Sequence, residues 1–311
     1  MADQPRETIA AAGAGRMGRG IAVVFAYAGY PVTLVDLKAR DANDAARVRD
    51  EALGEIRQTL SMLGAIGMVG EEAIEPIAAR VSFATAEQAG DAIGAADVIF
   101  EGVPETMDAK QEAFALLSEM ARKTAIIAST TSTMLADELQ DMVTPPERFL
   151  NAHWLNPAFL VPLVEISPGD KTDREITQRL VALLEGIGKV PVVCKASPGF
   201  IVPRLQALAM NEAARLVEEG VASAEDIDKA TRYGFGFRFA VLGVLEFIDW
   251  GGGDILYHAD RYMTQALGTD RYAAPKIVQD NMKAGRIGLK LYRQVKVYVE
   301  PGTGKLKEGL N

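Results

Sequence analysis

Short apolar runs alternate with helical patterns over the first half of the chain. The runs that predict buried strands cover residues 8–13, 31–36, 96–103 and 124–130. Residues 17–29 carry a helical pattern that ends at a glycine, and residues 41–63 carry a longer one with few helix breakers. Strand–helix–strand repeats at this spacing need crossover connections, which join parallel strands. The first half therefore predicts a doubly wound, mostly parallel α/β sheet.

The pattern changes near residue 149. Two strand-like segments, "RFLNAH" and "LVEIS", are joined by a proline-rich connection, and residues 189–195 predict another strand. After "SPGF" at 197–200 the patterns are helical, beginning with 200–219, and the next strand expected is 295–300. Ser223, followed by Asp226, predicts the N-terminus of a further helix. We therefore expect an α/β domain over residues 1–196 and a mostly α-helical domain over residues 197–311.

Composition narrows the class of protein. The chain has 311 residues, of which 49% are hydrophobic and 24% charged, as is typical of a globular protein with two domains. A net charge of −9 disfavours binding to nucleic acid or to acidic membranes. No apolar stretch reaches 18 residues and no basic-then-apolar leader is present, so neither a membrane helix nor a secretory signal is expected. With Cys194 as the single cysteine, we expect a protein of the reducing cytoplasm.

The first predicted strand leads into a glycine-rich loop, "GAGRMG" at 13–18, which opens a helix. In a G-x-G-x-x-G loop, Gly13 makes a tight turn, Gly15 lets the backbone approach a pyrophosphate, and Gly18 lets helix and strand pack closely. The second strand ends at Asp36, where a carboxylate accepts hydrogen bonds from the adenosine ribose and repels a 2′-phosphate. This pattern predicts a Rossmann-type domain that binds NAD through Gly13, Gly15, Met17, Gly18 and Asp36. The alternative is a tight turn followed by an ordinary surface aspartate.

His153 and Glu165 are two ionisable residues in apolar, strand-like surroundings. Their positions mirror about residue 159, so in an antiparallel pair with Phe159 at the centre of the connection they lie directly opposite each other. A carboxylate that holds one ring nitrogen fixes the histidine tautomer and raises the basicity of the other nitrogen. The spacing therefore predicts a general base, His153, oriented by Glu165. The alternative is a structural histidine satisfied by a nearby carboxylate.

Two further polar residues follow predicted strands. Ser132 comes directly after the strand at 124–130, at the end of the sheet where parallel sheets bind ligands, so its hydroxyl could bond a substrate oxygen. It could equally cap the helix that starts near Met134. Asn156 could bond substrate or cofactor, or simply form the turn before Pro157. No group of His, Cys and Asp has metal-ligand spacing, and we expect no metal.

Several motifs together indicate a family. They are "GAGRMGRGIA" at 13–22, "VPE" at 103–105 with Lys110, "STTS" at 129–132, "HWLNP" at 153–157, "PLVEI" at 162–166 and "PGFIVPR" at 198–204. Through them the chain resembles the 3-hydroxyacyl-CoA dehydrogenase family over nearly its whole length. The resemblance implies an NAD-binding domain, a helical domain through which the protein forms a homodimer, and active-site roles for Ser132, His153, Asn156 and Glu165. It also implies that Glu105 and Lys110 lie near the nicotinamide ribose.

Three segments depart from that family pattern. Pro203 stands where the family usually has an asparagine near the substrate, and proline offers neither an amide side chain nor a backbone N–H. In the family the helical pair at 41–80 carries lysines that bind CoA, whereas residues 56–70 of this chain have only Arg57 as a cation. "GLKLYRQVKVYVE" at 288–300 replaces a glycine-rich turn. Segments 204–220 and 234–243 are similar to the gulonate dehydrogenase and lambda-crystallin branch, whereas 245–254 is similar to the CoA branch.

We therefore expect an NAD-dependent dehydrogenase that oxidises a 3-hydroxyacyl-CoA to the 3-oxoacyl-CoA, with His153 as the general base. One alternative is a dehydrogenase of a free 3-hydroxy acid, similar to gulonate or carnitine. An alternative of another class is a non-catalytic NAD-binding protein of the crystallin or sensor type. The intact Ser132, His153 and Glu165 favour an enzyme, because a protein that only binds NAD has no physical need of them.

Overall fold

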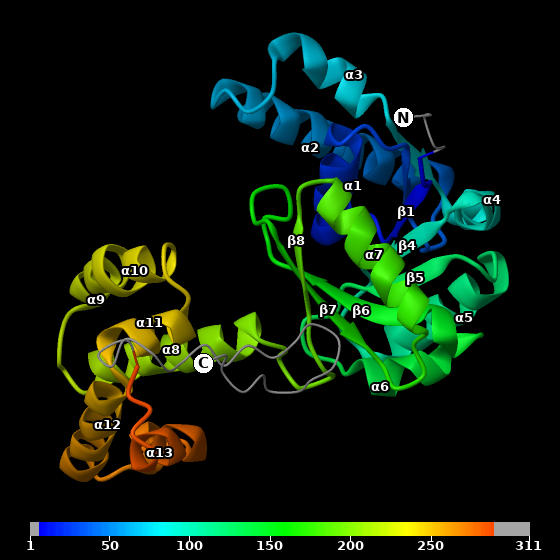
Figure 1. Cartoon of the computed structure of the whole chain (residues 1–311). Helices are drawn as coiled ribbons and strands as arrows, with labels where there is room; N and C mark the ends of the chain where they lie inside the picture. The colour runs from blue at the N-terminus through cyan, green and yellow to red at the C-terminus, as the bar shows by residue number, and fades with distance from the viewer. Residues whose placement is uncertain (1–5, 289–311) are drawn as a thin grey trace. The chain divides into compact units, whose positions relative to one another are not determined.

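The computed structural model describes residues 6–288, and its N-terminal part is built on one eight-stranded sheet (Figure 1). The strand order is β3-β2-β1-β4-β5-β6-β7-β8, and every neighbouring pair is parallel except β6 and β7, which are antiparallel. The strands are β1 Ile9–Ala12, β2 Val32–Val35, β3 Val81–Ala84, β4 Val98–Glu101, β5 Ile126–Ser129, β6 Phe149–Trp154, β7 Leu163–Pro168 and β8 Val190–Val193. The mostly parallel, doubly wound sheet predicted from the sequence is confirmed.

Seven of these strands were predicted from the sequence, and β3 was not. The segment "VSFA" is only four residues long, and its two middle residues are exposed and half-buried. β3 lies at the end of the sheet beside β2, which explains why its apolar signal is weak. The predicted antiparallel pair is confirmed as β6 and β7, so the connection that contains residue 159 joins them.

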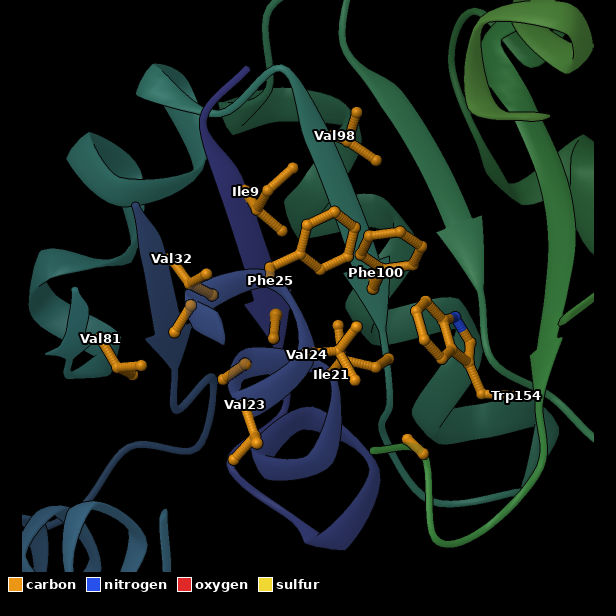
Figure 2. Packing of buried hydrophobic residues seen from close by; sticks show 14 of the residues in the cluster. Ile9, Ile21, Val23, Val24, Phe25, Val32, Val81, Val98, Phe100 and Trp154 are labelled. Carbon is orange, nitrogen blue, oxygen red and sulfur yellow. The ribbon is translucent and has the colours of Figure 1, made fainter. Parts of the chain in front are cut away.

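Helices cover both faces of the sheet and bury two separate apolar layers. Along β1, Ile9 and Ala11 belong to one layer, while Ala10 and Ala12 belong to the other. This alternation follows from the strand period of two residues and shows that both faces of β1 are covered. Figure 2 shows the first layer, in which Phe25 of α1 (Arg16–Tyr27) packs between strand residues and its ring lies 5.4 Å from that of Phe100.

The remaining helices up to residue 218 are α2 Ala42–Ala65, α3 Ile74–Ala78, α4 Ala89–Ala95, α5 Met107–Met120, α6 Ala136–Leu139, α7 Arg174–Gly186 and α8 Val202–Glu218. Short 3₁₀ turns cover Glu71–Ala73, Ala86–Gln88, Gln140–Met142 and Pro146–Arg148. The helices predicted at 17–29, 41–63 and 200–219 are confirmed as α1, α2 and α8. No helix within residues 6–288 combines the length and apolarity needed to cross a bilayer.

The described chain divides into two compact units between residues 210 and 211, inside α8. The second unit contains α9 Ala224–Ala230, α10 Phe237–Phe239, α11 Val244–Gly251, α12 Gly253–Leu267 and α13 Lys276–Lys283, with a π-helical turn at Thr231–Gly236 and a 3₁₀ turn at Asp270–Tyr272. Ser223 caps α9 by accepting from the Asp226 backbone N–H, as predicted. The division expected between residues 196 and 197 stays a prediction, and the strand expected at 295–300 lies outside the described residues.

Candidate active site

The glycine loop between β1 and α1 has the close contacts that its motif predicts. Gly13 has a φ of 126°, and a Cβ there would lie 2.6 Å from the carbonyl oxygen of Gly102. A Cβ on Gly18 would lie 2.1 Å from the Gly13 carbonyl oxygen, so both positions require glycine. A Cβ on Gly15 would meet no atom within 4 Å, and no side chain caps the first turn of α1. This open helix N-terminus fits the pyrophosphate of a dinucleotide, while Met17 packs against the apolar layer beneath it.

Asp36 directly follows β2 and is buried, as a ribose-binding carboxylate at the end of this strand should be. Its Oδ1 accepts from the Lys38 backbone N–H at 3.2 Å. Its Oδ2 accepts from Arg40 Nε at 2.5 Å, an ion pair with both side chains largely buried. The carboxylate therefore stands where the sequence predicts, with a guanidinium as its immediate neighbour.

A buried ion pair lies at the end of β4, and the sequence analysis missed its acidic partner. Glu101 is fully buried and Lys110 is 1% exposed, and Lys110 Nζ donates to both Glu101 oxygens at 2.9 and 3.0 Å. The Val103 backbone N–H and the Ser129 hydroxyl donate to the same carboxylate at 2.7 Å each. Every strong acceptor site of Glu101 is thus used, as the burial of a carboxylate requires. The sequence signal for Glu101 is its position as the lone glutamate at the end of the apolar strand "VIFE".

Glu105 binds the loop that carries Ser132. Its Oε1 accepts from the Ser132 and Thr133 backbone N–H groups at 3.0 and 3.3 Å, and from the hydroxyl groups of Thr131 and Thr133. Its Oε2 lies 3.5 Å from Lys110 Nζ. Partial burial alone would raise the pKa of Glu105, but the Thr131 hydrogen bond and the Lys110 charge outweigh it and lower the pKa. Glu105 is therefore an ionised clamp on residues 131–133.

His153 and Glu165 lie directly opposite each other on β6 and β7, as the mirror relation predicts. His153 Nδ1 is 2.8 Å from Glu165 Oε2, His153 is 5% exposed, and Glu165 is fully buried. His153 Nε2 makes no hydrogen bond within residues 6–288. The carboxylate thus holds one ring nitrogen and leaves the second available to a ligand.

The second oxygen of Glu165 caps helix α8, a contact that the sequence analysis did not predict. Oε1 accepts from the backbone N–H groups of Ile201 and Val202 at 2.9 and 2.8 Å. The preceding residue, Phe200, has a φ of 45°, and its ring stacks on the His153 imidazole with centroids 5.3 Å apart. The carboxylate and the aromatic ring together fix the orientation of the imidazole. Neither contact could be read from local spacing, because both join residues more than 30 positions apart.

Ser132 and Asn156 extend from the same end of the sheet as His153. β5 and β6 pair with Ser129 beside Asn151, and the Asn151 amide donates to the Met134 carbonyl at 2.9 Å, so the loop after β5 lies against β6. The Ser132 side chain is exposed, which leaves its hydroxyl free to meet a ligand. Asn156 precedes a cis Pro157 and is also exposed.

A pocket borders Asn156, between α1, α2 and the β6–β7 connection. Arg16, Arg19, Thr59, Asn156 and Phe159 are among its lining residues. The Arg19 guanidinium is paired with the Glu55 carboxylate, whereas Arg16 has no ion pair within the described residues. The pocket therefore offers a cation and an amide to a polar ligand.

Pro203 is the second residue of α8, and the helix begins at Val202. Proline is compatible with the first turn, where a backbone N–H has no partner within the helix. Within residues 6–288, no group of three or more His, Cys, Asp or Glu side chains could hold a metal ion.

Comparison with known proteins identifies the family. Residues 8–197 match the family "3-hydroxyacyl-CoA dehydrogenase, NAD binding domain", and residues 199–298 match "3-hydroxyacyl-CoA dehydrogenase, C-terminal domain". The chain is 31% identical to 5-formyl-3-hydroxy-2-methylpyridine 4-carboxylate 5-dehydrogenase of Mesorhizobium japonicum, over 91% of this chain and 87% of that protein. It is 32% identical to lambda-crystallin of Oryctolagus cuniculus, over 80% of this chain and 76% of that one. Its structure resembles a 3-hydroxyacyl-CoA dehydrogenase of Archaeoglobus fulgidus with a TM-score of 0.72 and 29% identity, over 92% and 89% of the two chains.

Proposed function

This chain belongs to the 3-hydroxyacyl-CoA dehydrogenase family of NAD-dependent oxidoreductases, and from that premise we propose that it oxidises a 3-hydroxyacyl-CoA to the 3-oxoacyl-CoA with His153 as the general base. The observation that carries the proposal is the 2.8 Å contact between His153 Nδ1 and Glu165. It supports a fixed tautomer, with Nε2 presented to the substrate hydroxyl.

Each candidate residue has a part in this proposal. NAD, when bound, supplies the acceptor for the hydride that leaves C3. His153 takes the hydroxyl proton, and the Glu165 carboxylate stabilises the resulting imidazolium. Ser132 and Asn156 hold the substrate oxygen, which becomes the ketone oxygen. These assignments rest on the placement of the four side chains at one end of the sheet.

The cofactor side of the proposal uses the loops after β1, β2 and β4. The glycine loop at 13–18 holds the pyrophosphate and Asp36 the adenosine ribose. Glu105 lies beside the nicotinamide ribose and at the same time binds the Ser132 loop. Because the Lys110 ammonium is buried against Glu101, we propose that Lys110 influences this ribose through Glu105.

A free hydroxy acid is the second candidate substrate. Two observations favour it: residues 56–70 hold Arg57 as their single cation, and one relative is named for a pyridine carboxylate, which is not a CoA ester. The kcat/KM values for 3-hydroxybutyryl-CoA and free 3-hydroxybutyrate decide between them. We expect the thioester to be oxidised at least tenfold more efficiently. Saturation by the free acid with the thioester inert would reject the CoA proposal.

The crystallin-like alternative is favoured by the lambda-crystallin relative. It requires NAD binding without turnover, so NADH formation with any member of a panel of hydroxyacyl-CoAs and hydroxy acids rejects it. The paired His153 and Glu165 favour catalysis, because burying an imidazole and a carboxylate is costly in a protein that only binds NAD.

We also propose that the chain forms a homodimer through residues 211–288. No hydrophobic side chain in this range is buried in the single chain. Large apolar residues are instead exposed, among them Phe237 at 70%, Leu245 at 77% and Trp250 at 62%. A helical unit without a buried apolar core requires a partner surface to stabilise it. A second copy of this chain is the partner that the family resemblance implies.

A further inference from the structure

A series of alternately charged side chains runs from Asp36, the proposed ribose ligand, into helix α2. Arg40 Nε donates to Asp36 at 2.5 Å, and Arg40 Nη1 donates to Asp44 at 2.6 Å. Arg47 then binds Asp44 from the other side and also donates to Glu51 at 2.7 Å. The exposed fractions of the side chains rise outward, from 10% at Asp36 through 20% at Arg40 to 33% at Asp44. Solvent therefore screens the Asp36–Arg40 ion pair less than the outer ion pairs of this series.

Asp44 is fixed by more than its ion pairs. It lies in the first turn of α2, and its backbone N–H donates to the capping carboxylate of Asp41 at 2.9 Å. The hydrogen bonds from Arg40 and Arg47 hold the pKa of Asp44 below its ordinary value. Asp44 and Asp36 in turn raise the pKa of Arg40. The Arg40 guanidinium is thus bound between two carboxylates.

An arginine close to the end of the second strand is the residue type that accommodates the 2′-phosphate of NADP in dinucleotide-binding folds. Arg40 has this residue type and position, but two of its nitrogens are occupied by carboxylates. A 2′-phosphate arriving there would meet two negative charges for one positive charge. If Asp44 were neutral, the guanidinium would be released from one side and one repulsive charge would be gone.

We propose that Asp44 is a second determinant of NAD selectivity, because it holds Arg40 against Asp36 and so denies this guanidinium to a 2′-phosphate. Exclusion of NADP is then shared between the carboxylate that meets the ribose and a carboxylate one helix turn beyond Arg40. This assignment does not depend on which hydroxy compound is the substrate. The competing interpretation is that Arg40 and Asp44 form an ordinary i,i+4 surface pair with no effect on the cofactor.

The test is equilibrium binding of NADH and NADPH, followed by nucleotide fluorescence, without any substrate. Asp44→Asn is compared with Glu51→Gln, a matched control that removes one negative charge from the same helix and the same Arg47 but does not touch Arg40. We expect the ratio of the NADPH Kd to the NADH Kd to fall at least about fivefold in Asp44→Asn, the size suited to one partly screened charge. Glu51→Gln should leave the ratio within about twofold of that of the unmodified chain.

The same substitution in an Arg40→Gln background shows whether Arg40 carries the effect. There the fall caused by Asp44→Asn should disappear. An unchanged ratio in Asp44→Asn, an equal fall in Glu51→Gln, or an equal fall without Arg40 would each overturn the proposal. Asp44→Ser, which suits the start of a helix, gives the same test if Asp44→Asn does not fold.

Discussion

The imidazole Nδ1 of His153 lies 2.8 Å from one oxygen of Glu165, whose other oxygen caps the N-terminus of α8. A single buried carboxylate thus orients the candidate base and anchors the segment whose Phe200 ring covers it. One oxygen of Glu165 contacts His153 and the other contacts the start of α8. A change of this residue should therefore disturb both contacts. The orientation of the candidate base and the start of α8 are thus coupled at Glu165.

Replacing Glu165 with glutamine tests this coupling. The amide keeps the size of the side chain but removes the charge that stabilises an imidazolium, so we expect kcat to fall about 10²-fold or more. Glu185→Gln, an exposed change on α7, should leave kcat unchanged. A normal kcat in Glu165→Gln would show that the carboxylate has no part in the chemistry.

The clamp formed by Glu105 predicts a pH effect on stability. The folded-state pKa of Glu105 is lowered, so its contribution to the free energy of unfolding is fully present above the unfolded pKa of about 4.3 and is lost as pH falls through the folded pKa. We therefore expect Glu105→Gln to destabilise the chain at pH 7 but to lose less stability than the unmodified chain below pH about 4.3. Urea unfolding at several pH values measures both. Parallel pH curves for the two proteins would contradict the prediction.

Lys189 should stabilise the connection that carries Asn156. Its buried ammonium donates to the Ala158 and Val161 carbonyl groups at 2.5 and 2.8 Å, and burial lowers the pKa of this lysine. Lys189→Met would leave two carbonyl groups without their donor, so we expect a loss of about 2–4 kcal/mol in the free energy of unfolding.

Lys195→Met is the control for this change, because Lys195 is exposed and has no hydrogen-bonded side-chain partner within residues 6–288. Denaturant unfolding of the two variants gives the comparison. Equal stability of Lys189→Met and Lys195→Met would show that the two carbonyl groups find other donors.

The proposed homodimer has a direct physical test. Sedimentation equilibrium of the purified chain should give twice the mass of the 33.4 kDa chain at micromolar concentration. Leu245→Glu, which places a charge at an exposed apolar position of α11, should shift the mass toward that of one chain. Glu246→Gln, at the neighbouring position, is the control, because it changes the surface of α11 without altering an apolar side chain. A single-chain mass for the unmodified protein would refute this dimer.

The strand spacing alone located the central pair of the site. Because β6 and β7 are antiparallel and centred on residue 159, counting positions was enough to place His153 opposite Glu165. The glycine loop was also predicted from the sequence, because its G-x-G-x-x-G pattern is local. The atom that a Cβ on Gly13 would meet belongs to Gly102, however, and the pattern does not show that contact.

The contacts that the sequence did not predict are long-range. Glu165 caps α8, and Glu105 accepts hydrogen bonds from residues 131–133. Local sequence patterns predict neither contact, because each joins segments that only the fold brings together. Arg40 follows Asp36 by four residues in the sequence, but its pairing with Asp44 depends on where α2 begins. Sequence patterns thus placed the candidate site residues better than they predicted the contacts that hold those residues in place.

The most direct test of the proposed mechanism is the rate of NADH formation by the unmodified chain and by His153→Ala, with NAD and 3-hydroxybutyryl-CoA. NADH binding by the variant is measured alongside, to show that the cofactor site is intact. The proposed mechanism predicts steady NADH formation by the unmodified chain and a fall of about 10²-fold or more in the variant, with NADH binding retained. Near-normal turnover by His153→Ala would contradict it.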